Sequence, residues 1–117
     1  GVRVVTENFK PLLSSGSNCM TLLEQTRDRV GMITDFGNYR GPAKYAEIGL
    51  TAARSASVHA KAHYDEDGMP DEVEFKRCLD SARAAGFDGA YVLIYDGPGD
   101  MWQGLERIRR LVEPYLA

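Results

Sequence analysis

Polar side chains that could bind a metal or move a proton lie in or just after four apolar segments of the chain. Glu7 and Asn8 follow the first segment, and Asp35 ends the second. His59 lies in the third, and Asp96 follows the fourth. Carboxylates combined with one imidazole form a mixed oxygen and nitrogen ligand set, which suits Mn²⁺, Co²⁺ or Mg²⁺ and is also compatible with Zn²⁺. These residue types therefore predict a divalent-metal site, provided that the fold brings them together.

The chemistry expected of such a site is sugar isomerisation or epimerisation. A divalent ion would polarise a carbonyl and a hydroxyl group and stabilise the enediolate that forms when a carboxylate removes the adjacent proton. Spacing by itself does not single out this role, because an acid at a strand end caps a helix or binds a loop amide about as often as it binds a metal. Both interpretations stay open at the level of the residues.

The elements that must position these residues alternate between strand and helix. Apolar runs predict strands beginning near residues 2, 30, 56 and 90, and the third of these runs extends to residue 64. Apolar residues at helical spacing predict helices over about 19–27, 43–54, 71–85 and 102–115. The order βαβαβαβα implies parallel strands joined by right-handed crossovers, so the polar strand ends are expected to converge at one edge of the sheet.

Two α/β folds fit this order in a single domain of 117 residues. One is a small doubly wound sheet, and the other is half of a (β/α)8 barrel with four βα units. No glycine-rich phosphate-binding fingerprint follows the first strand. The half-barrel is the competitor of the doubly wound sheet, and at the level of the residues both folds stay open.

Local signals also predict how two of the helices begin and end. Asp71, followed three residues later by Glu74, has the spacing of a capping box, and Gly86 is placed to end the same helix. Asp100 is the predicted cap of the last helix, so its charge would oppose an anion bound at the preceding glycine-rich loop.

Composition excludes several partners and settings. Fourteen Lys and Arg residues against seventeen Asp and Glu residues, interspersed along the chain, do not favour nucleic acid. No apolar run approaches the roughly 20 residues that span a membrane. The two cysteines form no CxxC motif, so neither a zinc motif nor a disulfide framework is indicated and a reducing, cytoplasmic setting is expected.

Four segments of the chain resemble successive motifs of a known family. They are VVTEN, TDFGN, VHAKAHYDEDG and AGFDGAYVLIYDG. In this order they resemble the C-terminal half of the xylose-isomerase-like TIM barrel family, which includes sugar phosphate isomerases and epimerases and AP endonucleases of the family 2 type. The resemblance spans nearly the whole chain and implies βα units 5 to 8 of a barrel. It also implies that Glu7, Asp35 and His59 bind the metal.

The chain departs from the family pattern at the fourth ligand. The resemblance implies a Glu where Ile94 stands, and the nearby acid is Asp96. Asp96 lies two residues further along the strand on the same side, so it is predicted as the replacement ligand and, with Glu7, as a catalytic acid or base. Only two histidines, His59 and His63, are present, which is too few for the zinc cluster of the endonucleases. A sugar or polyol is therefore the expected substrate.

Three further residues are predicted to contact the substrate. Lys61 and His63 alternate with His59, so all three should face the same side of their strand. Asn38 occupies a position where many relatives carry His. Two other interpretations stay open: Lys61 paired with an acid of the barrel interior, and His63 hydrogen-bonded at a loop edge.

A half-barrel leaves two strand edges unpaired and needs a covering partner. The expected partner is a missing N-terminal half-barrel or a second copy of the chain, and we expect the chain to be a piece of a longer enzyme. Two functions follow from the sequence. The first is a divalent-metal-dependent sugar or polyol isomerase or epimerase that needs the other half for activity. The second is a catalytically inactive half-barrel that acts through oligomerisation or partner binding.

Overall fold

The chain forms four strand–helix units in a computed structural model that describes residues 1–116. In chain order the elements are β1 (Val4–Glu7), α1 (Gly16–Gln25), β2 (Val30–Asp35), the 3₁₀ helix η1 (Phe36–Asn38), α2 (Lys44–Ala52), β3 (Ser55–Lys61), α3 (Glu72–Ala84), β4 (Ala90–Ile94), α4 (Met101–Val112) and the 3₁₀ helix η2 (Glu113–Tyr115). Every predicted strand and helix is present. None of the helices within residues 1–116 is both long enough and apolar enough to cross a membrane.

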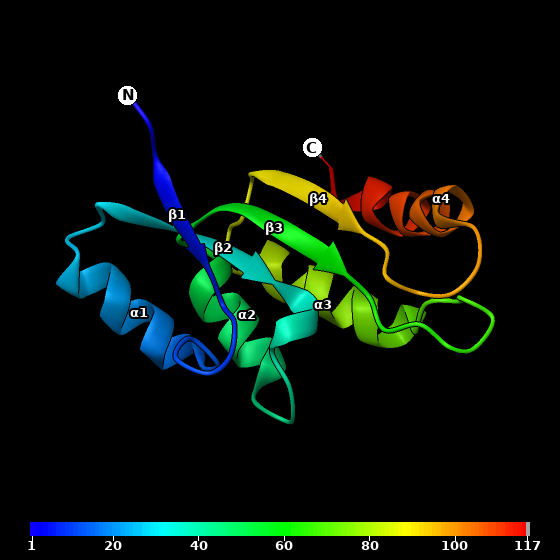
Figure 1. Ribbon diagram of the computed structural model, residues 1–117, viewed down its shortest axis with the longest axis horizontal. Helices are drawn as coiled ribbons and strands as arrows, with labels where there is room; N and C mark the ends of the chain where they lie inside the picture. Colours follow the sequence, from blue (N-terminus) through cyan, green and yellow to red (C-terminus); the bar gives the residue numbers. More distant parts are fainter. Residues whose placement is uncertain (117) are drawn as a thin grey trace.

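The four strands form one parallel sheet in the order in which they occur in the sequence, β1-β2-β3-β4. Because each crossover is right-handed and moves one strand in the same direction, successive helices fall on the same face of the sheet (Figure 1). A doubly wound sheet would reverse direction and place helices on both faces. The observed arrangement is that of four consecutive βα units of a (β/α)8 barrel.

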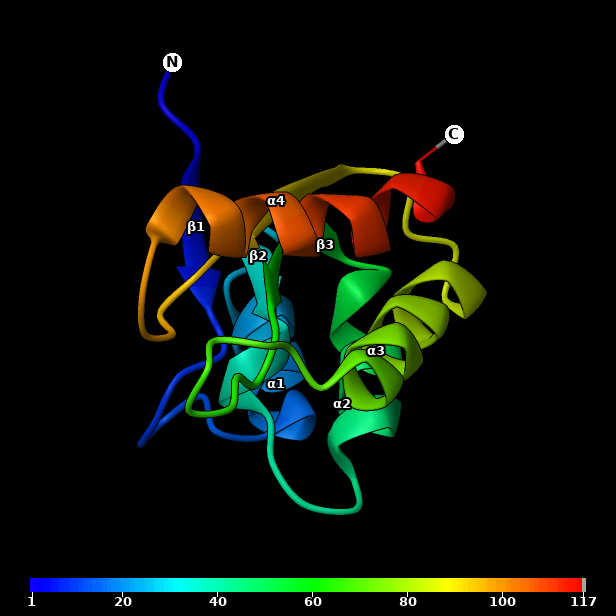
Figure 2. The same ribbon diagram turned by 90° about the vertical axis from the view of Figure 1, so that its right-hand side faces the viewer.

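The buried core lies between the sheet and the helices. On β3, Val58 and Ala60 are fully buried against Ile48 of α2, Phe75 of α3 and Ile108 of α4. A second apolar cluster joins α1 to β2 and consists of Leu13, Cys19, Leu23 and Met32. Alternate residues of the strands thus face the helices, and the layered packing is visible in Figure 2.

The remaining residues of the strands face the side that no helix covers in the described part of the chain. Asp35, His59 and Lys61 lie on this face, and so do Val5 and Val92 of the edge strands, which are 38% and 41% exposed. In a barrel this face is the enclosed interior. Asp35, His59 and Lys61 are therefore on the inner surface, and the helices on the outer surface supply the burial that holds the strands in place.

Helix ends follow the predicted signals with one exception. Asp71 Oδ1 accepts the backbone N–H of Glu74 at 3.0 Å, and Gly86 takes a positive φ of 80° just after α3. Asp100 caps α4 by accepting the N–H of Gln103 at 2.9 Å. The second half of the predicted capping box does not form, because the Glu74 carboxylate lies 2.5 Å from Nζ of buried Lys44. This ion pair links α3 to the start of α2 instead.

The third predicted strand is too long by three residues. β3 ends at Lys61, and a turn then brings Tyr64 into an isolated antiparallel bridge with Pro70. The strand alternation that was expected to orient His63 therefore stops two residues before it.

The helix-facing burial can be tested with a matched pair of valines. Val58→Ala removes two methyl groups from a fully buried site, whereas Val73 on α3 is 74% exposed. We expect Val58→Ala to lower the free energy of unfolding by about 2 kcal/mol and Val73→Ala to change it by less than about 0.5 kcal/mol. Urea denaturation followed by circular dichroism measures both. Equal effects would contradict the assignment of the buried face.

Candidate metal centre

Three of the four predicted metal ligands converge at the C-terminal edge of the sheet. Glu7 is the last residue of β1 and Asp35 the last of β2, while His59 on β3 pairs with Asp35 in the parallel register. One ligand atom from each side chain lies within 4.8 Å of the other two. Neighbouring parallel strands bring these residues together although 28 and 24 positions separate them along the chain.

The distances within this cluster suit a single small cation. His59 Nδ1 lies 3.3 Å from Glu7 Oε1 and 3.6 Å from Asp35 Oδ2. Adjacent ligands of an octahedral ion with bonds of about 2.1 Å are about 3 Å apart. Two carboxylate oxygens and one imidazole nitrogen match Mn²⁺, Co²⁺ or Mg²⁺ in type and are also compatible with Zn²⁺. The three residues fit such an ion with only a small inward movement.

Local backbone structure orients the Asp35 carboxylate. Its Oδ1 atom accepts the N–H groups of Gly37 at 2.7 Å and Asn38 at 3.1 Å, which caps the short helix η1. With Oδ1 occupied in this way, Oδ2 is left on the side of His59. A strand end that could have served only as a helix cap thus provides both a cap and a potential ligand.

Two asparagines tie the ends of β1 and β2 together around the carboxylates. The Asn8 amide exchanges two hydrogen bonds with the backbone of Asp35, donating at 3.0 Å and accepting at 2.7 Å. Asn38 Nδ2 donates to Glu7 Oε1 at 3.2 Å and to the Asn8 carbonyl at 3.0 Å. Groups that orient a ligand from behind support the geometry of metal sites. Asn38, predicted to contact the substrate, also contacts Glu7.

The electrostatics of the cluster favour a bound cation. The pKa of Asp35 is raised to about 6, mainly by burial and further by a hydrogen bond with Glu7 and the charge of Glu7, while the Gly37 N–H and the Lys61 charge oppose these effects. Asp35 is only 4% exposed, so water screens this repulsion poorly. A divalent ion bound between the carboxylates of Glu7 and Asp35 would attract both of them and so offset their mutual repulsion.

Asp96, the fourth predicted ligand, does not join the three-residue cluster. Its Oδ2 lies 2.6 Å from Nζ of Lys61, and this hydrogen bond raises the pKa of Lys61. β4 ends at Ile94, so strand alternation no longer sets the direction of the Asp96 side chain. The pairing of Lys61 with an acid, one of the two interpretations left open by the sequence, is the arrangement that the structure shows.

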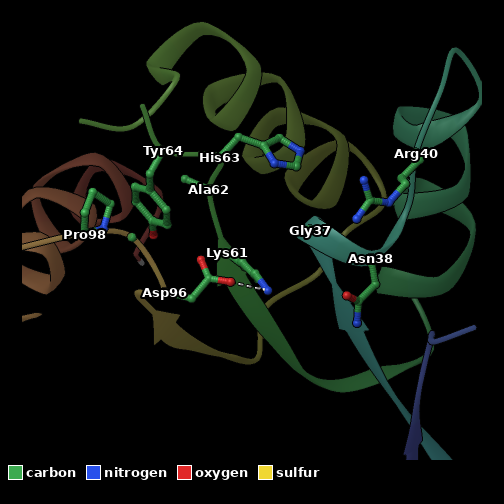
Figure 3. A pocket seen from close by; sticks show the side chains of 10 residues that line it. Gly37, Asn38, Arg40, Lys61, Ala62, His63, Tyr64, Asp96 and Pro98 are labelled. Atoms are coloured by element: carbon green, nitrogen blue, oxygen red, sulfur yellow. Dashed lines mark ion pairs between the residues drawn. The ribbon is translucent and has the colours of Figure 1, made fainter. Parts of the chain in front are cut away.

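A polar pocket of about 280 Å³ lies beside the cluster. Its lining residues are Gly37, Asn38, Arg40, Lys61, Ala62, His63, Tyr64, Asp96, Gly97 and Pro98. Figure 3 shows the Lys61–Asp96 pair at its base and the side chains of His63 and Arg40 at its rim. Because Asn38 both lines the pocket and contacts Glu7, the pocket adjoins the metal cluster.

All three predicted substrate-contacting residues line this pocket. His63 additionally lies near α2, with Nε2 3.4 Å from Lys44 Nζ. Arg40 also lines the pocket and is not among the residues predicted from the sequence. Its only signal was its place two residues after Asn38, in the loop that follows a strand carrying a predicted ligand. Loops at this end of parallel strands commonly supply binding residues.

No protein-family model matches the chain, and no curated protein matches it. The resemblance to the xylose-isomerase-like family therefore stays a prediction. Function must be argued from the geometry of the cluster and the pocket.

The raised pKa of Asp35 predicts a pH-dependent effect of Asp35→Asn. Ionisation of a group whose pKa is higher in the folded chain than its ordinary value of about 4 destabilises the fold as the pH rises through about 6. The substitution removes this charge and keeps an oxygen that can accept the Gly37 and Asn38 N–H groups. As the pH rises from about 4.5 to about 7.5, we expect the free energy of unfolding of Asp35→Asn to increase by on the order of 2 kcal/mol relative to that of the original chain.

Denaturation in the presence of a chelator, at several pH values, measures this difference. Asp88→Asn changes an exposed carboxylate outside the cluster and serves as the control. An Asp35→Asn effect that is flat with pH would show that Asp35 does not carry the repulsion described above.

Proposed function

We propose that the chain is the metal-binding half of a divalent-metal-dependent isomerase or epimerase acting on a sugar or polyol. The observation that carries the proposal is the cluster of Glu7, Asp35 and His59 beside a polar pocket, at the C-terminal edge of a parallel sheet. Active sites of barrels built from βα units lie at this edge.

In this proposal three side chains would hold the ion and two asparagines would keep them in place. The ion, when bound, supplies Lewis-acid polarisation of neighbouring carbonyl and hydroxyl oxygens of the substrate. Glu7, Asp35 and His59 present one ligand atom each. Asn8 and Asn38 join the backbone of β2 to the end of β1, so the spacing of the two carboxylates is set before any ion binds.

Isomerisation also needs groups that take and return a proton within reach of the substrate. The Glu7 side chain is 35% exposed and the Asp35 side chain only 5%, so Glu7 is the carboxylate of the cluster that a substrate can approach. On the other side of the pocket, Asp96 and the protonated Lys61 form a carboxylate and ammonium pair. We assign proton removal to Glu7 and proton return to the Lys61 ammonium, which Asp96 holds in place; water then takes the proton from Glu7 and restores the one lost by Lys61.

The open inner face explains why this half would need a complement. Sugar isomerisation proceeds best in a site closed to bulk water. No element of residues 1–116 covers the face that carries the cluster, and Val5 and Val92 on it are exposed. A covering half-barrel would exclude water, pair the two free strand edges and supply further ligands to the ion.

The metal site is tested by calorimetric titration of the chelator-treated chain with Mn²⁺. We expect one ion to bind, and His59→Ala to weaken binding by roughly 100-fold, because removal of even an indirect partner of a metal ligand weakens binding by about 10- to 100-fold. His63→Ala is the matched control, because His63 lies outside the cluster, and should change the affinity by less than about twofold. Absence of Mn²⁺ binding, or equal losses in the two variants, would rule out the proposed site.

The free strand edges favour a second function, a catalytically inactive half-barrel that acts by associating with another copy or another protein. β1 and β4 each have a strand on one side only among the described residues. Unpaired edges and exposed valines on the inner face both promote association. The two functions differ in whether metal binding accompanies the association.

Association is measured by sedimentation equilibrium of the isolated chain. We expect a mass well above the 12.9 kDa of one chain. Val92→Lys should shift the distribution toward the monomer, because it places a charge on the open face, whereas Val73→Lys on the exposed side of α3 should not. A stable monomer would contradict the oligomeric function. An assembly that binds no Mn²⁺ would favour it over the isomerase.

A further inference from the structure

The pocket beside the metal cluster carries a positive charge that forms no ion pair with an acid among residues 1–116. Lys61 is paired with Asp96, and Lys44, which contacts His63, is paired with Glu74. Arg40 is different, because it takes part in none of the ion pairs formed within residues 1–116. The net charge at the pocket rim is therefore that of the Arg40 guanidinium.

The orientation of Arg40 suits recognition of an anion. Figure 3 shows its guanidinium and the His63 imidazole extending toward one another at the rim, on the side away from the Lys61–Asp96 pair. A guanidinium offers planar, paired N–H donors that match two oxygens of a phosphate or carboxylate, and imidazole adds a third donor. This donor set sits in a concave and polar environment rather than on a flat surface.

We propose that this pocket binds an anionic group of the substrate, a phosphate ester or a carboxylate, with Arg40 as its principal contact and His63 as the second. The assignment to a substrate rests on the proposed function: the reacting oxygens lie at the Glu7, Asp35 and His59 cluster, and the anionic end lies at Arg40. The substrate class is then a phosphorylated sugar or a sugar acid.

The dimensions and charges of the site agree with a substrate whose reacting oxygens lie at the metal cluster and whose anionic end lies at Arg40. About 280 Å³ is just below the range for small-molecule sites, roughly 300–1,000 Å³, and suits an anionic group with a short carbon chain. Gly37 and Asn38 form the boundary between the two parts, since both line the pocket and both donate backbone N–H groups to Asp35. The carboxylates of Glu7 and Asp35 and the guanidinium of Arg40 thus occupy opposite sides of one short loop.

The subsite is tested by titrating the isotopically labelled chain with inorganic phosphate and, separately, acetate at constant ionic strength, while amide shifts are followed by NMR. We expect shifts at residues 37–40 and 61–64, and an affinity for the preferred anion that falls roughly tenfold in Arg40→Gln. The anion affinity of Arg40→Lys should lie between those of the original chain and Arg40→Gln, because a lysine keeps the charge and loses the paired donors. Tighter binding of inorganic phosphate would identify a phosphate ester as the natural group, and tighter binding of acetate would identify a carboxylate.

Arg27→Gln is the matched control, because Arg27 is an exposed arginine in the turn after α1 and lies outside the pocket. Equal affinities in the original chain, Arg40→Gln and Arg27→Gln would overturn the subsite. Mn²⁺ titration of the same samples separates the two proposals. A chain that binds phosphate through Arg40 but binds no Mn²⁺ supports the anion subsite and contradicts the isomerase, whereas a chain that binds Mn²⁺ with no Arg40-dependent anion binding contradicts the subsite alone.

Discussion

The burial of the Asp35 carboxylate beside Glu7 is the constraint on which the site depends. Two like charges in a poorly hydrated position destabilise the fold unless other groups compensate them, and the structure provides three kinds of compensation. Backbone N–H groups of η1 bind one oxygen of Asp35, the Asn8 and Asn38 amides hold the two strand ends together, and the His59 imidazole stands between the carboxylates. One potential ligand atom of each of Glu7, Asp35 and His59 faces the open side, where a divalent cation would offset the remaining repulsion between the carboxylates.

The fold tolerates this arrangement because the apolar residues that stabilise it and the polar residues of the candidate site lie on opposite faces of the sheet. Parallel strands in sequential order place every helix on one face, where Val58, Phe75 and their neighbours are fully buried. The opposite face is left to polar residues, including the Lys61–Asp96 pair, and to a few exposed valines. A half-barrel can thus keep a pre-arranged cluster of carboxylates and imidazole on a face that no helix of residues 1–116 covers.

Strand alternation predicted the positions of residues within strands and failed just beyond their ends. His59 and Lys61 lie within β3, and both face the open side as expected. His63 and Asp96 lie two residues past the ends of β3 and β4, where loop contacts set their directions: His63 lies near Lys44, and Asp96 pairs with Lys61. Side chains alternate between the two faces only along extended backbone, so this alternation does not predict the direction of a side chain beyond the end of a strand. The fourth ligand was therefore the least predictable part of the site.

The sequence by itself determined the four βα units, their parallel order and the convergence of Glu7, Asp35 and His59, because apolar periodicity and chain connectivity decide these features locally. Only the tertiary structure decided which polar groups pair with one another. Nothing in the spacing indicates that Asn38 binds Glu7, that Glu74 pairs with Lys44 instead of completing the capping box, or that Arg40 takes part in none of the ion pairs within residues 1–116. Such pairings depend on distances of a few ångströms between segments remote in the chain, which are set by the packing of the helices against the sheet.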